Sequence, residues 1–133
     1  MPASEDSAQA EIPGQSLAVW AETLYLANLL LAPVLAFAVL LWLYLKRSPG
    51  MPALAVCHLR QAISASLWTG ALLAVASSAI ILLGGCAAPT TWIILIIYFT
   101  ACHSTMVLLG VLGLARAMAG QKYVFPLVGK PCD

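Results

Sequence analysis

Side chains that can bind a metal come together at one place in this sequence. His103 lies in the middle of the last of three long apolar stretches, with Cys102 beside it and Met106 three residues later. Imidazole, thiol and thioether groups suit copper(I). Neighbours on a helix project about 100° apart, however, so only His103 and Met106 share a face. One histidine and one methionine make an incomplete copper site.

Haem is a second alternative. An ionisable side chain at mid-membrane, as expected for His103, is costly and is a functional candidate by default. The other histidine, His58, is expected at the membrane surface, a difference in depth on the order of 15 Å at 1.5 Å per helical residue. One haem therefore cannot bind both histidines of the same chain, and a ligand from another subunit would be needed.

Polar packing is the alternative that needs no cofactor. A neutral His103 imidazole can hydrogen-bond a serine of a neighbouring span, and bonds of this kind contribute about 0.6 kcal/mol on average. A contact between His103 and another subunit stays open as well. We expect no metal or cofactor site formed by this chain alone, with copper and haem kept as alternatives.

The remaining polar residues do not supply the parts of an enzyme. Of five acidic residues, four lie within the first 22 positions and one is the last residue. No nucleophile–base pair, paired carboxylate or phosphate-binding glycine loop is recognisable. A net charge of +1 offers no basic patch of the kind that nucleic acids require. We therefore expect neither catalysis nor nucleic-acid binding, and no small-molecule substrate.

The composition indicates an integral membrane protein. Hydrophobic residues make up 62% of the chain and charged residues 8%, whereas soluble domains carry about 25% charged residues. The apolar residues form three blocks, each near the roughly 20 residues that cross a hydrocarbon core. The sequence predicts an all-α membrane protein with three transmembrane helices, at about residues 24–45, 62–83 and 92–114.

The segments around these spans differ in character. Residues 1–16 form a polar, acidic tail, and the transmembrane domain extends over residues 17–118. Pro33 falls near the middle of the first span and is expected to kink it, because proline removes a helical hydrogen bond. Residues 53–60 are expected to form a short interfacial helix before the second span. Residues 119–133 form a basic, aromatic tail.

The basic residues predict the orientation. Three crossings would place the loop after the first span and the C-terminal tail on one side of the membrane. All six basic residues would then share that side, which the positive-inside rule makes cytoplasmic. We expect the N-terminus outside and the C-terminus inside, with these six residues at the cytoplasmic face: Lys46, Arg47, Arg60, Arg116, Lys122 and Lys130.

Small residues predict where helices pack. In lipid, helix association depends on close backbone approach, so a strip of small side chains is a packing face. Such residues recur at every fourth position of the second span, and two glycines lie near the end of the third. The expected packing positions are Ala62, Ser66, Gly70, Ala74, Ser78, Gly110 and Gly113.

The four cysteines are expected to be free thiols. Cys57, Cys86 and Cys102 fall at three different expected depths. A disulfide requires Cα atoms within about 7 Å of one another. We expect the cysteines to act as small apolar residues.

Two polar segments carry a family resemblance. Residues 58–62 read His-Leu-Arg-Gln-Ala, and residues 117–126 read Ala-Met-Ala-Gly-Gln-Lys-Tyr-Val-Phe-Pro. Together they resemble small bacterial membrane proteins of unknown function that are distantly similar to a chloroplast inner-envelope protein-import component. The resemblance implies three or four helices, a bacterial inner membrane and no established chemistry. It marks as candidate interface or partner contacts His58, Arg60, Gln61, Tyr123 and Pro126.

These observations favour a non-catalytic accessory, structural or assembly subunit of a larger membrane complex. Its partners would be the lipid bilayer and other integral membrane subunits. A self-assembling pore is an alternative, because three-span phage holins look similar in size and topology, although they usually end in a densely charged tail. A metal- or haem-carrying subunit that uses His103 is the other alternative.

Overall fold

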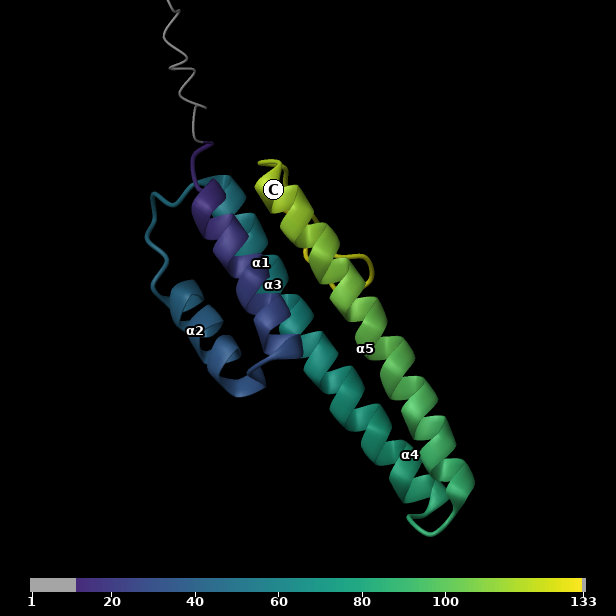
Figure 1. Ribbon diagram of the computed structural model, residues 1–133. Helices are drawn as coiled ribbons and strands as arrows, with labels where there is room; N and C mark the ends of the chain where they lie inside the picture. The colour runs from purple at the N-terminus through teal and green to yellow at the C-terminus, as the bar shows by residue number, and fades with distance from the viewer. Residues whose placement is uncertain (1–11, 133) are drawn as a thin grey trace, which may run out of the picture.

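A computed structural model describes residues 12–132, and these form helices without any strand. In chain order, the structure contains α1 (Gln15–Leu30), α2 (Pro33–Leu45), α3 (Ala53–Ala71), a π-helical turn η1 (Leu72–Ala76), α4 (Ser77–Gly84) and α5 (Pro89–Met118) (Figure 1).

Two helices of the described chain are long and apolar enough to cross a membrane. One is the continuous helix Ala53–Gly84, which joins α3, η1 and α4, and the other is Pro89–Met118. With 32 and 30 residues, they are about 48 and 45 Å long, longer than a hydrocarbon core of about 30 Å. Most of the side chains in their apolar windows are not buried in protein. This exposure supports membrane association.

The predicted first span is divided into two short helices. α1 ends at Leu30, and α2 begins at Pro33. The N–H groups of Leu31 and Ala32 both bond to the Ala27 carbonyl, which closes α1. Proline suits the first position of a helix because its missing N–H has no partner there in any case. Figure 1 shows α2 running back beside α1. The prediction of one continuous helix with a kink at Pro33 is therefore wrong.

The hairpin of α1 and α2 changes which parts of the chain lie together. Gln15 Nε2 donates a hydrogen bond of 2.6 Å to the Met118 carbonyl. Ala18, Leu54 and Ala117 form one buried apolar cluster. The start of α1, the start of α3 and the end of α5 therefore lie at the same end of the bundle (Figure 1). The predicted topology places the segment before the first span and the segment after the last span on opposite sides of the membrane. In the structure, these two segments lie at the same end.

Residues 53–60 are not a separate interfacial helix. They form the first turns of α3 and continue into the long helix without a break. Leu54 and Cys57 are buried against the rest of the bundle, and Arg60 is half-buried. The covering α1–α2 hairpin turns this stretch into part of the protein core.

The bundle has a wide and a narrow half. In the wide half, α1, α2, α3 and α5 pack around a core that includes Tyr25, Leu40, Leu59 and Phe125. Beyond the tip of the α1–α2 hairpin, η1 and α4 continue beside the first part of α5 (Figure 1). We call residues 72–100 the two-helix arm; in it, only Thr91 is buried.

Candidate functional site

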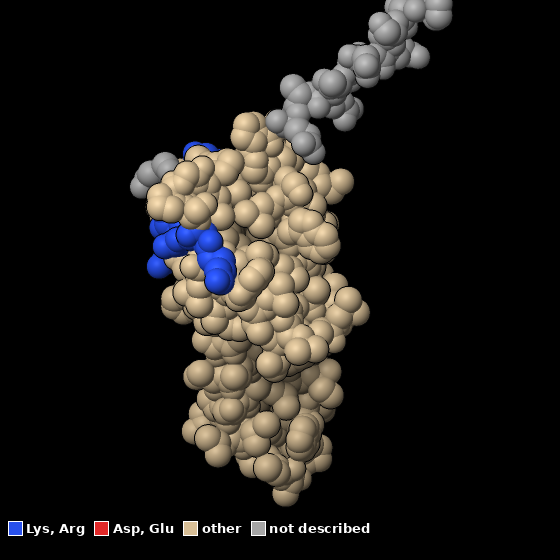
Figure 2. Space-filling view, turned by 90° about the vertical axis from the view of Figure 1, so that its left-hand side faces the viewer, with Lys and Arg blue, Asp and Glu red and all other residues tan. Residues whose placement is uncertain are grey.

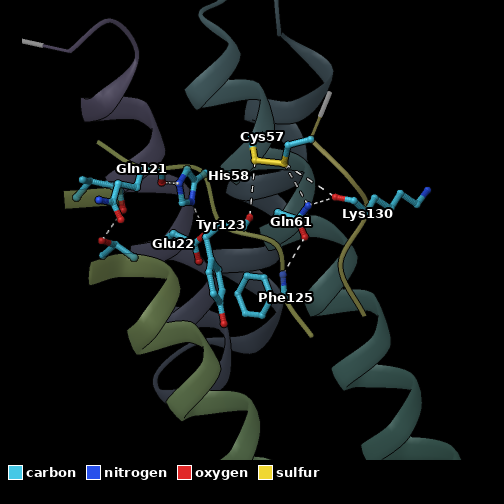
Figure 3. Close-up of polar contacts among 11 residues, drawn as sticks. Glu22, Cys57, His58, Gln61, Gln121, Tyr123, Phe125 and Lys130 are labelled. Carbon is cyan, nitrogen blue, oxygen red and sulfur yellow. Dashed lines mark hydrogen bonds and ion pairs between the residues drawn. A yellow bond between two sulfur atoms is a disulfide. The ribbon is translucent and has the colours of Figure 1, made fainter. Parts of the chain in front are cut away.

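The C-terminal segment folds back across α3, and we call residues 119–132 the strap. Ser64 Oγ donates a 2.8 Å hydrogen bond to the Val128 carbonyl. The Gln61 side chain bonds the strap twice: its Oε1 accepts the Phe125 N–H at 3.3 Å, and its Nε2 donates to the Lys130 carbonyl (Figure 3). Gln61 is fully buried, so these bonds satisfy an amide that would otherwise be costly to bury.

An aromatic side chain anchors the middle of the strap. Phe125 is 1% exposed and meets Tyr25 of α1 edge-on, with ring centroids 5.2 Å apart. Tyr123 packs against the same ring at 5.1 Å. T-shaped pairs of this kind contribute about 0.5–1.5 kcal/mol beyond area burial. The strap is therefore part of the core of the wide half.

A buried acid–base pair lies beneath the strap. His58 Nδ1 of α3 is 2.7 Å from Glu22 Oε1 of α1, and both side chains are fully buried. His58 Nε2 is 2.9 Å from the Gln121 carbonyl of the strap. One imidazole thus joins α1, α3 and the strap (Figure 3).

The hydrogen bonds determine how protons are distributed over this pair. A carbonyl can only accept, so His58 Nε2 carries a hydrogen. One further proton lies between His58 Nδ1 and Glu22 Oε1. The pair has no net charge, whether this proton is on the imidazole or on the carboxyl. Burial raises the pKa of the Glu22 carboxyl, while the hydrogen bond and charge of His58 oppose this rise. The pair can hold a proton, and both of its side chains are shielded from solvent.

Two glycines of α5 allow α1 to approach closely. A Cβ on Gly113 would lie 2.6 Å from Glu22 Oε2, and a Cβ on Gly110 would lie 2.6 Å from Tyr25 Cε1. The Tyr25 hydroxyl donates to the Met106 carbonyl at 3.2 Å. Both glycines were predicted as packing positions, and both lie where α1 and α5 meet.

A disulfide connects the strap to α3. Cys57 and Cys132 are bonded, with Cα atoms 5.3 Å apart. Our prediction of four free thiols is therefore wrong for this pair. The C-terminal segment returns to α3 and brings Cys132 beside Cys57. Cys86 and Cys102 are free.

The two segments that carry the family resemblance lie against each other. His58 and Gln61 bond the strap directly, and Tyr123 belongs to its aromatic contact. Arg60 is half-buried and Pro126 is exposed. Three of these five positions, His58, Gln61 and Tyr123, thus take part in the contact between α3 and the strap.

His103 lies away from this contact. Its ring stacks on Phe99, with centroids 5.6 Å apart, and its Nδ1 has no hydrogen-bond partner among residues 12–132. His103 and Gly70 line the same cavity. Gly70 is about 18 Å along the helix from His58, so His103 lies far from the acid–base pair. In the described part of the chain, no three His, Cys, Asp or Glu side chains are grouped as metal ligands. Met106 is buried, and its backbone carbonyl accepts the Tyr25 hydroxyl.

The small-residue strip is packed at one end and bare at the other. Ala62 and Ser66 are buried in the wide half. Gly70, Ala74 and Ser78 are exposed, and a Cβ on Gly70 would meet nothing within 4 Å.

Sequence reasoning missed three parts of this site: Glu22, Gln121 and Cys132. None of the three was predicted as a site residue. A single carboxylate close to long apolar stretches, in a chain with only two histidines, was an available signal for an acid–base pair. His58 bonds the backbone carbonyl of Gln121, and a pattern of side chains cannot predict a contact to a backbone group.

Comparisons with protein-family models, with curated proteins and with solved structures find no match for this chain.

Proposed function

We propose that this protein is a non-catalytic accessory subunit that binds other integral membrane subunits through its two-helix arm. The observation that carries the proposal is the contrast between the halves. In the wide half, the buried side chains of His58, Gln61 and Ser64 hydrogen-bond the strap. In the arm only Thr91 is buried, and the small residues Ala74 and Ser78 are exposed.

A groove on the arm has features suited to a transmembrane helix. It has a volume of about 600 Å³ and extends from the arm to Gly70, at the end of α3. One wall is formed by residues 70–77 and the other by residues 92–100 of α5. Gly70 and Ala74 form part of one wall, and Trp92 and Phe99 form part of the other. Small side chains let a neighbouring backbone approach closely in lipid. Ser77 also lines the groove, and its hydroxyl has no partner among residues 12–132.

The buried acid–base pair supports a structural role in this proposal. A general acid or base must come within hydrogen-bond reach of a substrate atom. Glu22 and His58 are fully buried, and the strap lies over them. Their role is to join α1, α3 and the strap, so that the wide half holds the arm in position.

We further propose an orientation in the bacterial inner membrane. The long helices cross the bilayer, and the α1–α2 hairpin enters and returns on the cytoplasmic side. Lys and Arg side chains visible in Figure 2 gather at the wide end, and the narrow end shows none on that face. The positive-inside rule favours the wide end as cytoplasmic. The start of α1 then lies on the same side as the C-terminal strap.

Site-specific photocross-linking in native membranes tests the partner surface. A photoreactive amino acid at Ala74, in the groove, is expected to give discrete adducts with other membrane proteins. The matched control is Val39, which is 46% exposed on α2 in the wide half and is expected to give no discrete protein adduct. Equal results at both positions would contradict the proposal.

A further inference from the structure

The strap is held to α3 by one covalent bond and several weaker ones. Cys57–Cys132 fixes its end, and hydrogen bonds from Gln61, Ser64 and His58 hold the rest. The strap also covers the buried Glu22–His58 pair. When the strap is attached, it therefore covers this face of α3.

The compartment makes this disulfide unusual. In the proposed orientation, on which this inference rests, the wide end faces the cytoplasm. Thioredoxin and glutathione keep thiols reduced there, and cytoplasmic disulfides are usually transient, catalytic or redox-sensing. A bond that only stapled the fold would not be expected on this side.

We propose that Cys57–Cys132 is a reversible thiol–disulfide exchange site, reduced by a cytoplasmic dithiol protein of the thioredoxin class, and that it latches the strap. Cys57 is 3% exposed, whereas Cys132 is half-buried. An attacking thiolate therefore reaches the Cys132 sulfur first.

The dithiol protein supplies all the electrons and protons that this exchange needs. Its thiolate bonds to Cys132 Sγ, the Cys57–Cys132 bond breaks, and Cys57 leaves as a thiolate that takes up a proton. The second thiol of the reductant then attacks the mixed disulfide and releases Cys132 as a thiolate, which is also protonated. Two electrons and two protons pass to the chain, and the dithiol protein ends as a disulfide.

Reduction leaves the strap with its noncovalent contacts alone. When it detaches, Gln61 and Ser64 lose their partners and become polar groups on an open face of α3. His58 loses the Gln121 carbonyl, so the Glu22–His58 pair becomes accessible to water. The released face is a second polar surface, separate from the groove on the arm.

The strap contains its own reporter. Lys122 is exposed and is followed by Tyr123, so trypsin can cut after it when the strap detaches. Inside-out membrane vesicles that carry the full chain are treated with reduced thioredoxin. Thiols are counted with a mass-tagged maleimide, and trypsin cleavage after Lys122 is followed by fragment mass. The chain is expected to change from two reactive thiols to four, with cleavage about tenfold faster.

Two variants sharpen the test. Cys132→Ser is expected to be cleaved at the fast rate with or without thioredoxin. Cys86→Ser removes an exposed free cysteine and is expected to respond as the natural chain does. A chain that keeps two reactive thiols in the presence of thioredoxin overturns the proposal, and so does a chain that reaches four reactive thiols without faster cleavage.

The outcomes separate the latch from the orientation. If Lys122 of Cys132→Ser is cut in inside-out vesicles but thioredoxin does not reduce the natural chain, only the latch fails. If Lys122 is cut only when trypsin is outside intact spheroplasts, the cytoplasmic orientation fails, and the latch fails with it.

Discussion

His58 Nδ1 lies 2.7 Å from Glu22 Oε1, and neither side chain is exposed. The two residues come from α1 and α3, are 36 positions apart and meet beneath the C-terminal strap. Removing one partner of a buried pair leaves an unsatisfied polar group, whereas removing both does not.

Glu22→Ala is therefore expected to lower the free energy of unfolding in detergent by about 3 kcal/mol, because His58 keeps an unpaired nitrogen. Glu22→Gln keeps a donor for His58 Nδ1 and is expected to cost less than about 1 kcal/mol. Tryptophan fluorescence during thermal or denaturant unfolding measures both. A loss for the Glu22→Ala/His58→Ala double variant equal to the sum of the single losses would contradict the pairing.

Gly113→Ala is expected to lower stability by about 1–3 kcal/mol, the usual cost of overpacking. The added Cβ would lie 2.6 Å from Glu22 Oε2, so α1 must move away. Gly70→Ala is the matched control in the other long apolar helix, since its Cβ meets nothing within 4 Å. Unfolding midpoints of the two variants in one detergent provide the comparison. Similar losses at both positions would argue against close contact of α1 and α5.

Gln61→Ala is expected to loosen the strap without breaking the disulfide. It leaves the Phe125 N–H and the Lys130 carbonyl without their side-chain partner, at a cost of about 1–3 kcal/mol for buried groups. Trypsin cleavage after Lys122 in the oxidised protein is expected to accelerate. Ser78→Ala, on the arm, is the control, and an equal acceleration there would contradict the role of Gln61.

Tyr98→Phe is expected to have a small effect. The Tyr98 hydroxyl donates a 2.7 Å bond to the Leu72 carbonyl, where the π-helical turn begins. Interhelical bonds in lipid contribute about 0.6 kcal/mol on average. The free energy of unfolding in detergent is therefore expected to fall by about 0.6 kcal/mol. A loss several times larger would mean that this bond maintains the π-helical turn.

The composition indicated the long apolar helices, and the residue sizes indicated some of the close contacts between helices. Two long apolar helices are present, close to residues 62–83 and 92–114 but extended at the wide end. Gly110 and Gly113 contact α1 because only glycine leaves room for Glu22 and Tyr25 there. Local signals of this kind depend on residue size and hydropathy, which a sequence displays directly.

The course of the first apolar stretch could not be predicted in the same way. Its 22 residues have the length of a span, and proline at position 33 is compatible with a kink as well as with a new helix. Tertiary contacts decide between them: α2 turns back to pack against α3. The strap was missed for a similar reason, since most of its bonds to α3 use backbone groups.

Native gel electrophoresis of mildly solubilised membranes tests the central claim most directly. The natural chain is expected to migrate in a defined large assembly that contains other membrane proteins, identified by mass spectrometry. Gly70→Leu, which fills the groove on the arm without entering the core, is expected to release the chain from that assembly while it stays folded. A natural chain that migrates alone or as a ladder of its own oligomers would contradict the role as an accessory subunit.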